Sequence, residues 1–145
     1  MQVATMMLAF AVGAGLVLQV GMNMALGRAF GSPVAASMVN FLVGSAALAT
    51  FVLLRAELPG RAAIAGVPAW AWFGGLLGAM YVTVATLAGP RLGALLLLAL
   101  TVAGQMVASI VVDHYGLLGF AQQPVTAMRL LGVAFLVAGI VLVAR

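Results

Sequence analysis

Residues 92–112 read LGALLLLALTVAGQMVASIVV, an apolar run without a charged side chain. A helix of this length crosses the hydrocarbon core of a bilayer. Thr101, Gln105 and Ser109 follow one another at a spacing of four residues, which places them on one face of that helix. The Thr101 and Ser109 hydroxyls can bond the carbonyl four residues earlier, and lipid tails cannot hydrogen-bond a Gln amide. This face must therefore meet another helix, another subunit or a water-filled path.

The composition is that of an integral membrane protein. Of 145 residues, 66% are apolar and 6% are charged, and the mean hydropathy is +1.30, whereas soluble domains are about 25% charged. The basic charge comes from single, scattered arginines, which argues against a nucleic-acid-binding surface. The lack of cysteine excludes disulfides, cysteine-held zinc and thiol catalysis. The first apolar run has no basic residue before it, so we expect a retained span rather than a signal peptide.

Five apolar segments predict an all-α membrane protein, a single domain with five transmembrane helices. We expect Gly27 to end the first helix and Ser32-Pro33 to begin the second. We expect Gly89-Pro90-Arg91 to separate the third helix from the fourth. The predicted spans cover residues 3–26, 33–54, 70–88, 92–112 and 128–144.

Polar side chains on three other spans extend the candidate site. Gln19 and Asn23 share one face of the first span, and Asn40 lies on the second. An amide near the midplane offers donors and an acceptor for a neutral or zwitterionic solute, and its alternative role is a hydrogen bond between helices. Tyr81 on the third span can close a pocket or satisfy a carbonyl. The predicted substrate-binding residues are Gln105, Gln19, Asn23, Asn40, Tyr81, Thr101 and Ser109.

Asp113 and His114 are the one adjacent acid–imidazole pair in the sequence, at the end of the fourth span. Because histidine titrates near neutral pH, the pair is a candidate for proton coupling, and anchoring at the headgroups or a helix-end contact is the alternative. No cluster has metal-ligand spacing, and no serine has a base that the sequence places beside it. We therefore expect no metal, no other cofactor and no enzymatic activity.

The arginines give no preferred orientation in the membrane. Five spans divide them equally between the two sides, with Arg55, Arg61 and Arg129 on one and Arg28, Arg91 and Arg145 on the other. Many transporters place their site between inverted repeats, and no internal repeat is visible here. We therefore expect an oppositely inserted second copy, giving an antiparallel homodimer of ten helices. The alternative is a fixed orientation set by the N-terminal amine or by a partner.

Short motifs occur in a set order along the whole chain. They are Gln19…Asn23-Met-Ala-Leu-Gly-Arg28, Gly31-Ser-Pro33, Phe41-Leu-Val-Gly44, Ala71-Trp72 with Gly74-Gly75, Gly78 and Tyr81-Val82, Gly89-Pro-Arg-Leu-Gly-Ala94, Ala103-Gly-Gln105 and Asp113-His-Tyr-Gly116. This order resembles the YdcZ-like family, small bacterial inner-membrane proteins of the drug/metabolite transporter superfamily. The resemblance implies five transmembrane helices, dual-topology homodimers or paired oppositely oriented homologues, and export of small molecules.

The related small multidrug resistance proteins exchange protons against cationic substrates through an acidic residue in their first helix. No carboxylate precedes Glu57 in this chain, which counts against that mechanism here.

We expect a multi-pass transporter of the bacterial inner (cytoplasmic) membrane. Its substrate is expected to bind at the midplane between the polar faces of spans one, two and four, at a dimer or helix-bundle interface. Its expected partners are the lipid bilayer, a second copy or an oppositely oriented homologue, and a small molecule, with no nucleic acid. A non-transporting scaffold or accessory subunit of a larger complex is the alternative. Sealed polar faces favour the scaffold, and a water-accessible Gln105 favours the transporter.

Overall fold

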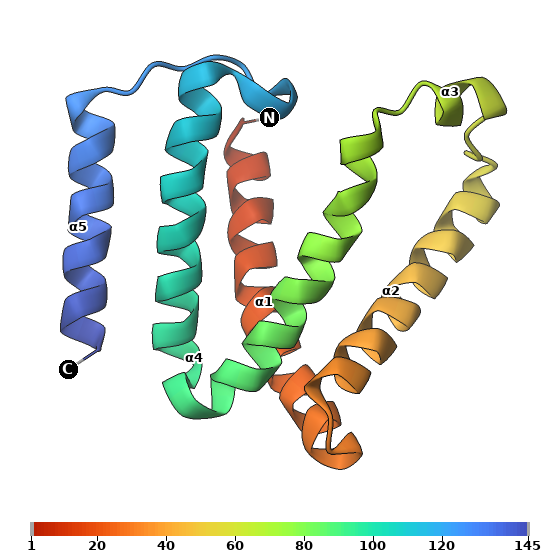
Figure 1. Cartoon of the computed structure of the whole chain (residues 1–145), viewed down its shortest axis with the longest axis horizontal. Coiled ribbons are helices and arrows are strands. Elements are labelled where there is room, and N and C mark those ends of the chain that lie inside the picture. The colour runs from red at the N-terminus through yellow and green to blue at the C-terminus, as the bar shows by residue number, and fades with distance from the viewer. Residues whose placement is uncertain (1, 145) are drawn as a thin grey trace. The chain divides into compact units, whose positions relative to one another are not determined.

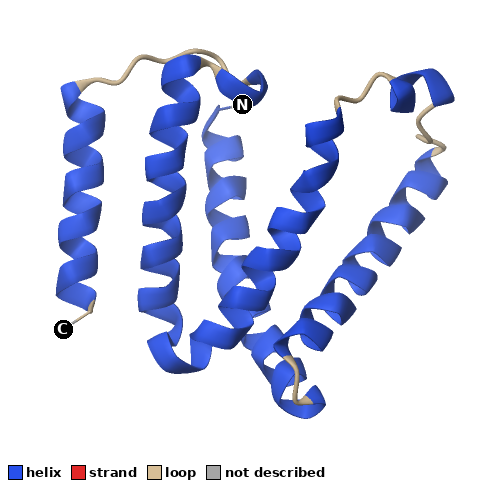
Figure 2. Ribbon diagram, in the orientation of Figure 1, coloured by secondary structure: helices blue, strands red, loops and turns tan. Residues whose placement is uncertain are grey.

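A computed structural model describes residues 2–144, which are helical apart from their connections and contain no strand (Figure 2). The predicted all-α class is therefore confirmed. The elements are α1 (Gln2–Phe30), α2 (Pro33–Arg55), α3 (Arg61–Ala65), the 3₁₀ helix η1 (Ala69–Phe73), α4 (Gly74–Tyr115), the 3₁₀ helix η2 (Leu117–Gly119) and α5 (Ala127–Val143) (Figure 1).

Three stretches are long and apolar enough to cross a membrane: α1, α2 and Ala69–Tyr115. The third of these is interrupted at Gly93, where the backbone leaves helical geometry at φ 74° and ψ 163°. The interruption divides α4 into two apolar segments, each close to the roughly 20 residues that a span requires. The 17 residues of α5 are apolar throughout most of their length and stand at the short end of the range for a span.

The expected break at Gly89-Pro90-Arg91 was wrong. Pro90 lies inside α4, and the chain leaves helical geometry only at Gly93. Proline removes one backbone donor and disturbs a helix, but it holds φ near −65°, a value that a helix accepts. Glycine adopts a positive φ without steric cost, so the backbone leaves helical geometry at the first glycine after the proline.

The expected end of the first helix at Gly27 was also wrong. The helix continues to Phe30, and Gly31 follows with φ 66°. Gly27 has a packing role instead, because a Cβ atom there would lie 3.1 Å from Thr86 Cγ2 on α4. The start of α2 is as expected: Ser32 is its N-cap, the Ser32 hydroxyl accepts a hydrogen bond from the Ala35 N–H at 3.2 Å, and Pro33 is the first helical residue.

The chain forms two compact units, Met1–Pro90 and Arg91–Arg145. In the first, α1, α2 and the first part of α4 meet through small and hydroxyl side chains. The buried residues of this unit are Val20, Asn23, Ala36, Ser37, Val82, Ala85, Thr86 and Gly89. They gather near the α1–α2 turn, and Figure 1 shows α2 and the green part of α4 diverging from there toward α3.

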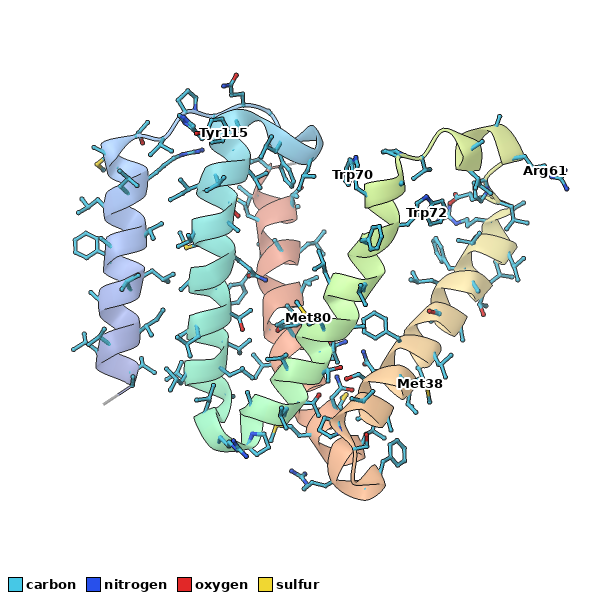
Figure 3. All side chains as sticks on the ribbon, in the orientation of Figure 1. Met38, Arg61, Trp70, Trp72, Met80 and Tyr115 are labelled. Atoms are coloured by element: carbon cyan, nitrogen blue, oxygen red, sulfur yellow. The ribbon has the colours of Figure 1, made fainter. Side chains whose placement is uncertain are left out.

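Aromatic and basic side chains mark the α3 end of the first unit. Trp70 and Trp72 are exposed just before α4, and Arg61 begins α3 (Figure 3). The Arg55 guanidinium lies 5.2 Å from the centre of the Phe51 ring. Tryptophan and arginine concentrate where a membrane meets water, so this end of the unit has the composition of a membrane interface.

The second unit contains the remainder of α4 and α5, joined by the connection at residues 116–126. Thr126 caps α5, because its hydroxyl accepts a hydrogen bond from the Arg129 N–H at 3.3 Å. Leu97 is its one buried apolar residue among those that the structure describes. Most apolar side chains of this unit therefore remain available to lipid or to another chain.

Candidate functional site

A pair of side-chain amides joins the first two helices. The Gln19 Nε2 group on α1 donates a hydrogen bond of 3.3 Å to Asn40 Oδ1 on α2. The tight turn between α1 and α2 brings the second half of α1 alongside the first half of α2, and Gln19 and Asn40 lie in these two halves. The structure thus brings together two of the predicted site residues from different spans.

Asn23 lies one helical turn beyond Gln19 and is 2% exposed. No hydrogen bond within residues 2–144 involves its side chain. Every fully buried side-chain nitrogen or oxygen in that range has a hydrogen-bond partner. The amide atoms of Asn23 have no such partner, so they are not fully buried, and the small exposed surface of Asn23 includes its amide. Asn23 is therefore a nearly buried amide with unused hydrogen-bonding capacity.

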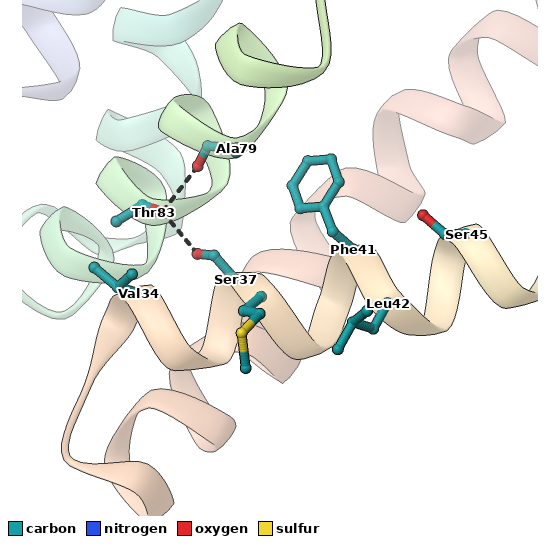
Figure 4. Close-up of a pocket in the computed structure, with 8 residues that line it drawn as sticks. Val34, Ser37, Phe41, Leu42, Ser45, Ala79 and Thr83 are labelled. Atoms are coloured by element: carbon teal, nitrogen blue, oxygen red, sulfur yellow. Dashed lines mark hydrogen bonds between the residues drawn. The ribbon is translucent and has the colours of Figure 1, made fainter.

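Two hydroxyl groups link α2 to the first part of α4. The Thr83 hydroxyl lies 2.9 Å from Ser37 Oγ and 2.8 Å from the Ala79 carbonyl, and the Ser37 hydroxyl donates to the Pro33 carbonyl at 2.9 Å (Figure 4). Thr83 has one proton for two acceptors, so the contact with Ser37 competes with a bond inside its own helix. The Thr83 hydroxyl can therefore exchange its bond to Ser37 on the other helix for the bond to the Ala79 carbonyl.

The candidate site predicted from the sequence includes neither Ser37 nor Thr83. The signal was present: Ala79, Thr83 and Thr86 follow one another at four and three residues, which makes a stripe of small and hydroxyl side chains on one helix face. The Thr86 hydroxyl bonds the Val82 carbonyl at 2.8 Å and is buried.

Two cavities lie along α2 in the first unit. The amide cavity, of about 370 Å³, is lined by Gln19, Asn40, Phe41, Val43, Gly44, Ser45, Leu48 and Val82. The hydroxyl cavity, of about 350 Å³, is lined by Val34, Ser37, Met38, Phe41, Leu42, Ser45, Ala79 and Thr83. Phe41 and Ser45 line both, so these two side chains lie where the cavities adjoin. Figure 4 shows the residues that line the hydroxyl cavity.

Tyr81, the predicted site residue of the third span, is half-buried and lines neither cavity. Thr83 follows Tyr81 by two residues, which is a rotation of about 200° around the helix axis, so the two side chains point in nearly opposite directions. The hydroxyl that reaches the hydroxyl cavity is therefore that of Thr83.

The remaining predicted substrate-binding residues belong to the second unit. The Thr101 hydroxyl bonds the Leu97 carbonyl at 2.9 Å, the internal contact that the sequence offered as its alternative. Gln105 is exposed on the same helix. Ser109 lines a separate cavity of about 250 Å³ together with Met106, Ile110, Asp113, Arg129, Gly132 and Val133.

Asp113 and His114 hold the connection at residues 116–126 against the end of α4. Arg129 Nη1 donates to Asp113 Oδ2 at 3.3 Å and to the Gln123 carbonyl, and Arg129 Nη2 donates to Gln123 Oε1. The Gln123 N–H bonds the Asp113 carbonyl at 2.7 Å. Arg129 lies in the first turn of α5, where the helix dipole opposes a cation, and the Asp113 carboxylate offsets that repulsion.

The His114 ring has a comparable structural role. Its Nδ1 accepts a hydrogen bond from the Val125 N–H at 3.3 Å, and the Tyr115 ring packs edge-on against it at 4.7 Å. The Gln122 amide donates to the His114 carbonyl at 3.0 Å. An Nδ1 atom that accepts this bond leaves the ring proton of the neutral histidine on Nε2.

Comparison with protein families decides the identity. The model of the family described as "Putative inner membrane exporter, YdcZ" matches residues 4–142. The chain belongs to this YdcZ family. Searches of curated proteins and of solved structures found no match.

Membership confirms the resemblance drawn from the ordered motifs. Like its family, this YdcZ protein is a multi-pass protein of the inner membrane, and it is a membrane transporter of the exporter type. The apolar helices of the structure agree with that location. Within the described residues of this YdcZ protein, no group of three or more His, Cys, Asp or Glu side chains is placed to hold a metal ion.

Proposed function

We propose that the chain is one subunit of an exporter for small molecules, with its site on the polar faces of spans one, two and four. The observation that carries the proposal is the amide cavity, where Gln19 and Asn40 face a space of about 370 Å³ between otherwise apolar helices. Small-molecule sites are concave, mostly apolar, of about 300–1,000 Å³, and contain a few well-placed polar groups.

The packing of the first unit supports a path rather than a sealed bundle. Close contacts gather near the α1–α2 turn, where a Cβ atom at Gly89 would lie 2.8 Å from Met24 Sδ. The hydroxyl cavity begins beside this packing, at Val34 and Ser37, and the amide cavity continues along α2 to Leu48. A unit that is closed at one end and hollow beyond it is a suitable half of an alternating-access transporter.

We propose further that the five spans form one transmembrane domain and that two copies assemble in opposite orientations. The equal division of arginines between the two sides supports both insertions, and so does the large apolar surface that the helices leave uncovered. An oppositely oriented homologue can take the place of the second copy. In this assembly Gln105, Thr101, Ser109 and Tyr81 complete the substrate-binding set, and the protein acts without enzymatic chemistry or cofactor.

A membrane scaffold is the competing function, because the Gln19–Asn40 bond is also what a purely structural contact between helices would contain. The two functions differ in whether water reaches the polar face. The chain has no cysteine, so single cysteines can be introduced at Gln105 and, as a matched control on the same helix, at Val107, which is 53% exposed.

The two single-cysteine chains are compared in membranes with a charged thiol reagent, which reacts only where water reaches the thiol. The transporter predicts that Gln105→Cys reacts in at least one condition while Val107→Cys, facing lipid, stays unmodified. If both positions resist the reagent in every condition, the scaffold function is correct and the proposed path is not.

A further inference from the structure

We propose that the amide cavity and the hydroxyl cavity together select an uncharged ligand, one with an apolar ring and a group that both donates and accepts hydrogen bonds, such as a primary carboxamide. The inference rests on the proposed function and adds to it the chemical class of the substrate. It is carried by three features of the first unit: the absence of charge, the unused amide groups and the position of Phe41.

No charged side chain lines either cavity in the described part of the chain. The sequence between Arg28 and Arg55 has no charged residue, and neither do residues 2–27. A second copy of the same chain therefore brings no counter-charge on these spans. An ionised ligand would lose its hydration without gaining a partner charge, which is strongly unfavourable, whereas an uncharged ligand avoids that penalty.

The amide pair leaves a donor and an acceptor free. The Gln19–Asn40 bond uses one Gln19 N–H and one lone-pair direction of the Asn40 carbonyl. The Gln19 carbonyl and the Asn40 amino group remain able to bond a ligand, so an acceptor and a donor lie beside each other. A primary carboxamide presents both a donor and an acceptor, so one such group can bond the Gln19 carbonyl and the Asn40 amino group.

Phe41 offers an apolar surface next to these groups. Its ring points from α2 toward the first part of α4 (Figure 4), where Gly78 leaves room: a Cβ atom there would lie 3.3 Å from Phe41 Cζ. Since Phe41 lines both cavities, a planar ligand can pack on the ring from either one. The ligand's polar end then reaches Asn40 and its ring reaches Phe41.

Ser45 supplies the reporter position, because it lines both cavities and differs from cysteine by one atom. The Ser45→Cys chain in detergent micelles, where reagents reach it from both ends, is treated with uncharged N-ethylmaleimide. The modification rate is measured with increasing benzamide, benzamidinium or benzoate, three probes of almost equal shape with neutral, positive and negative charge. Ala47→Cys, which lines neither cavity, controls for effects on the micelle.

Benzamide is expected to halve the rate at a concentration at least about tenfold below that of either charged probe, because only the charged probes lose hydration without compensation. Adding Asn40→Leu, which keeps the size of the side chain, should raise the benzamide concentration needed by about tenfold through the lost hydrogen bonds. If that double variant does not fold, the comparison of the three probes on Ser45→Cys still decides whether the cavities select an uncharged ligand.

Equal protection by all three probes, or better protection by a charged one, overturns the inference and leaves the proposed function standing. A Ser45→Cys thiol that no maleimide reaches overturns both, because the cavities would then be closed to any solute.

Discussion

Replacing Gly27 by leucine should separate the helices of the first unit. A Cβ atom at this position lies 3.1 Å from Thr86 Cγ2, which is closer than ordinary carbon contacts, and 3.8 Å and 3.9 Å from Pro33 Cα and Ala36 Cβ. Thr86 cannot easily move away, because its hydroxyl bonds the Val82 carbonyl at 2.8 Å. The further carbons of leucine have no space between these walls.

Overpacking of this kind costs about 1–3 kcal/mol, equivalent to a factor of about 5 to 150 in the unfolding equilibrium. The free energy of unfolding of each variant is measured by reversible unfolding in mixed micelles. Gly21→Leu is the matched control, because the same substitution on the same helix meets nothing within 4 Å. It includes the same gain in helix propensity, so the difference between the variants isolates the packing. Equal stabilities of the two variants would refute the close contact of α1 with α4.

Three further substitutions test the hydrogen bonds. A double-mutant cycle with Gln19→Leu and Asn40→Leu should give a coupling energy of about 0.6–1.7 kcal/mol in unfolding measurements, and zero coupling would mean that the amides do not meet. Thr83→Val should cost about 1 kcal/mol, whereas Thr50→Val, which loses only an exposed bond within its own helix, should change stability by less than about 0.5 kcal/mol; equal effects would contradict the link between helices. Asp113→Asn should cost at most about 1 kcal/mol, since both ion-pair side chains are about one-third exposed, and the cost should fall with added salt; a salt-independent loss would count against the ion pair.

Composition predicts the membrane location, because too few polar residues are present to cover a soluble protein, and the long apolar segments predict the helical class. Glycines show where sequence reasoning fails. Gly27 and Gly93 are both glycines in apolar segments, yet Gly27 packs against Thr86 inside α1, whereas Gly93 leaves helical geometry and interrupts α4. The role of each glycine depends on which other segment of the chain packs beside it. The local sequence does not show contacts with segments that are distant along the chain.

The candidate site could be predicted in part. The amides Gln19 and Asn40 were expected on facing spans, and the structure joins them. The link between Ser37 and Thr83 could not be predicted, because a threonine in a helix normally bonds its own backbone and only the rotation of α4 about its axis turns Thr83 toward α2. Whether these groups and Gln105 contact a substrate stays a prediction.

The proposed pair of oppositely inserted copies is tested most directly by the side of the membrane on which one loop lies. Glu57, exposed in the connection between α2 and α3, is replaced by cysteine, the single thiol of the chain. Intact cells are labelled with a membrane-impermeant reagent, and permeabilised cells give the total. The antiparallel homodimer predicts that about half of the protein is labelled from outside. Labelling near zero or near completion would mean a single orientation and would contradict the homodimer.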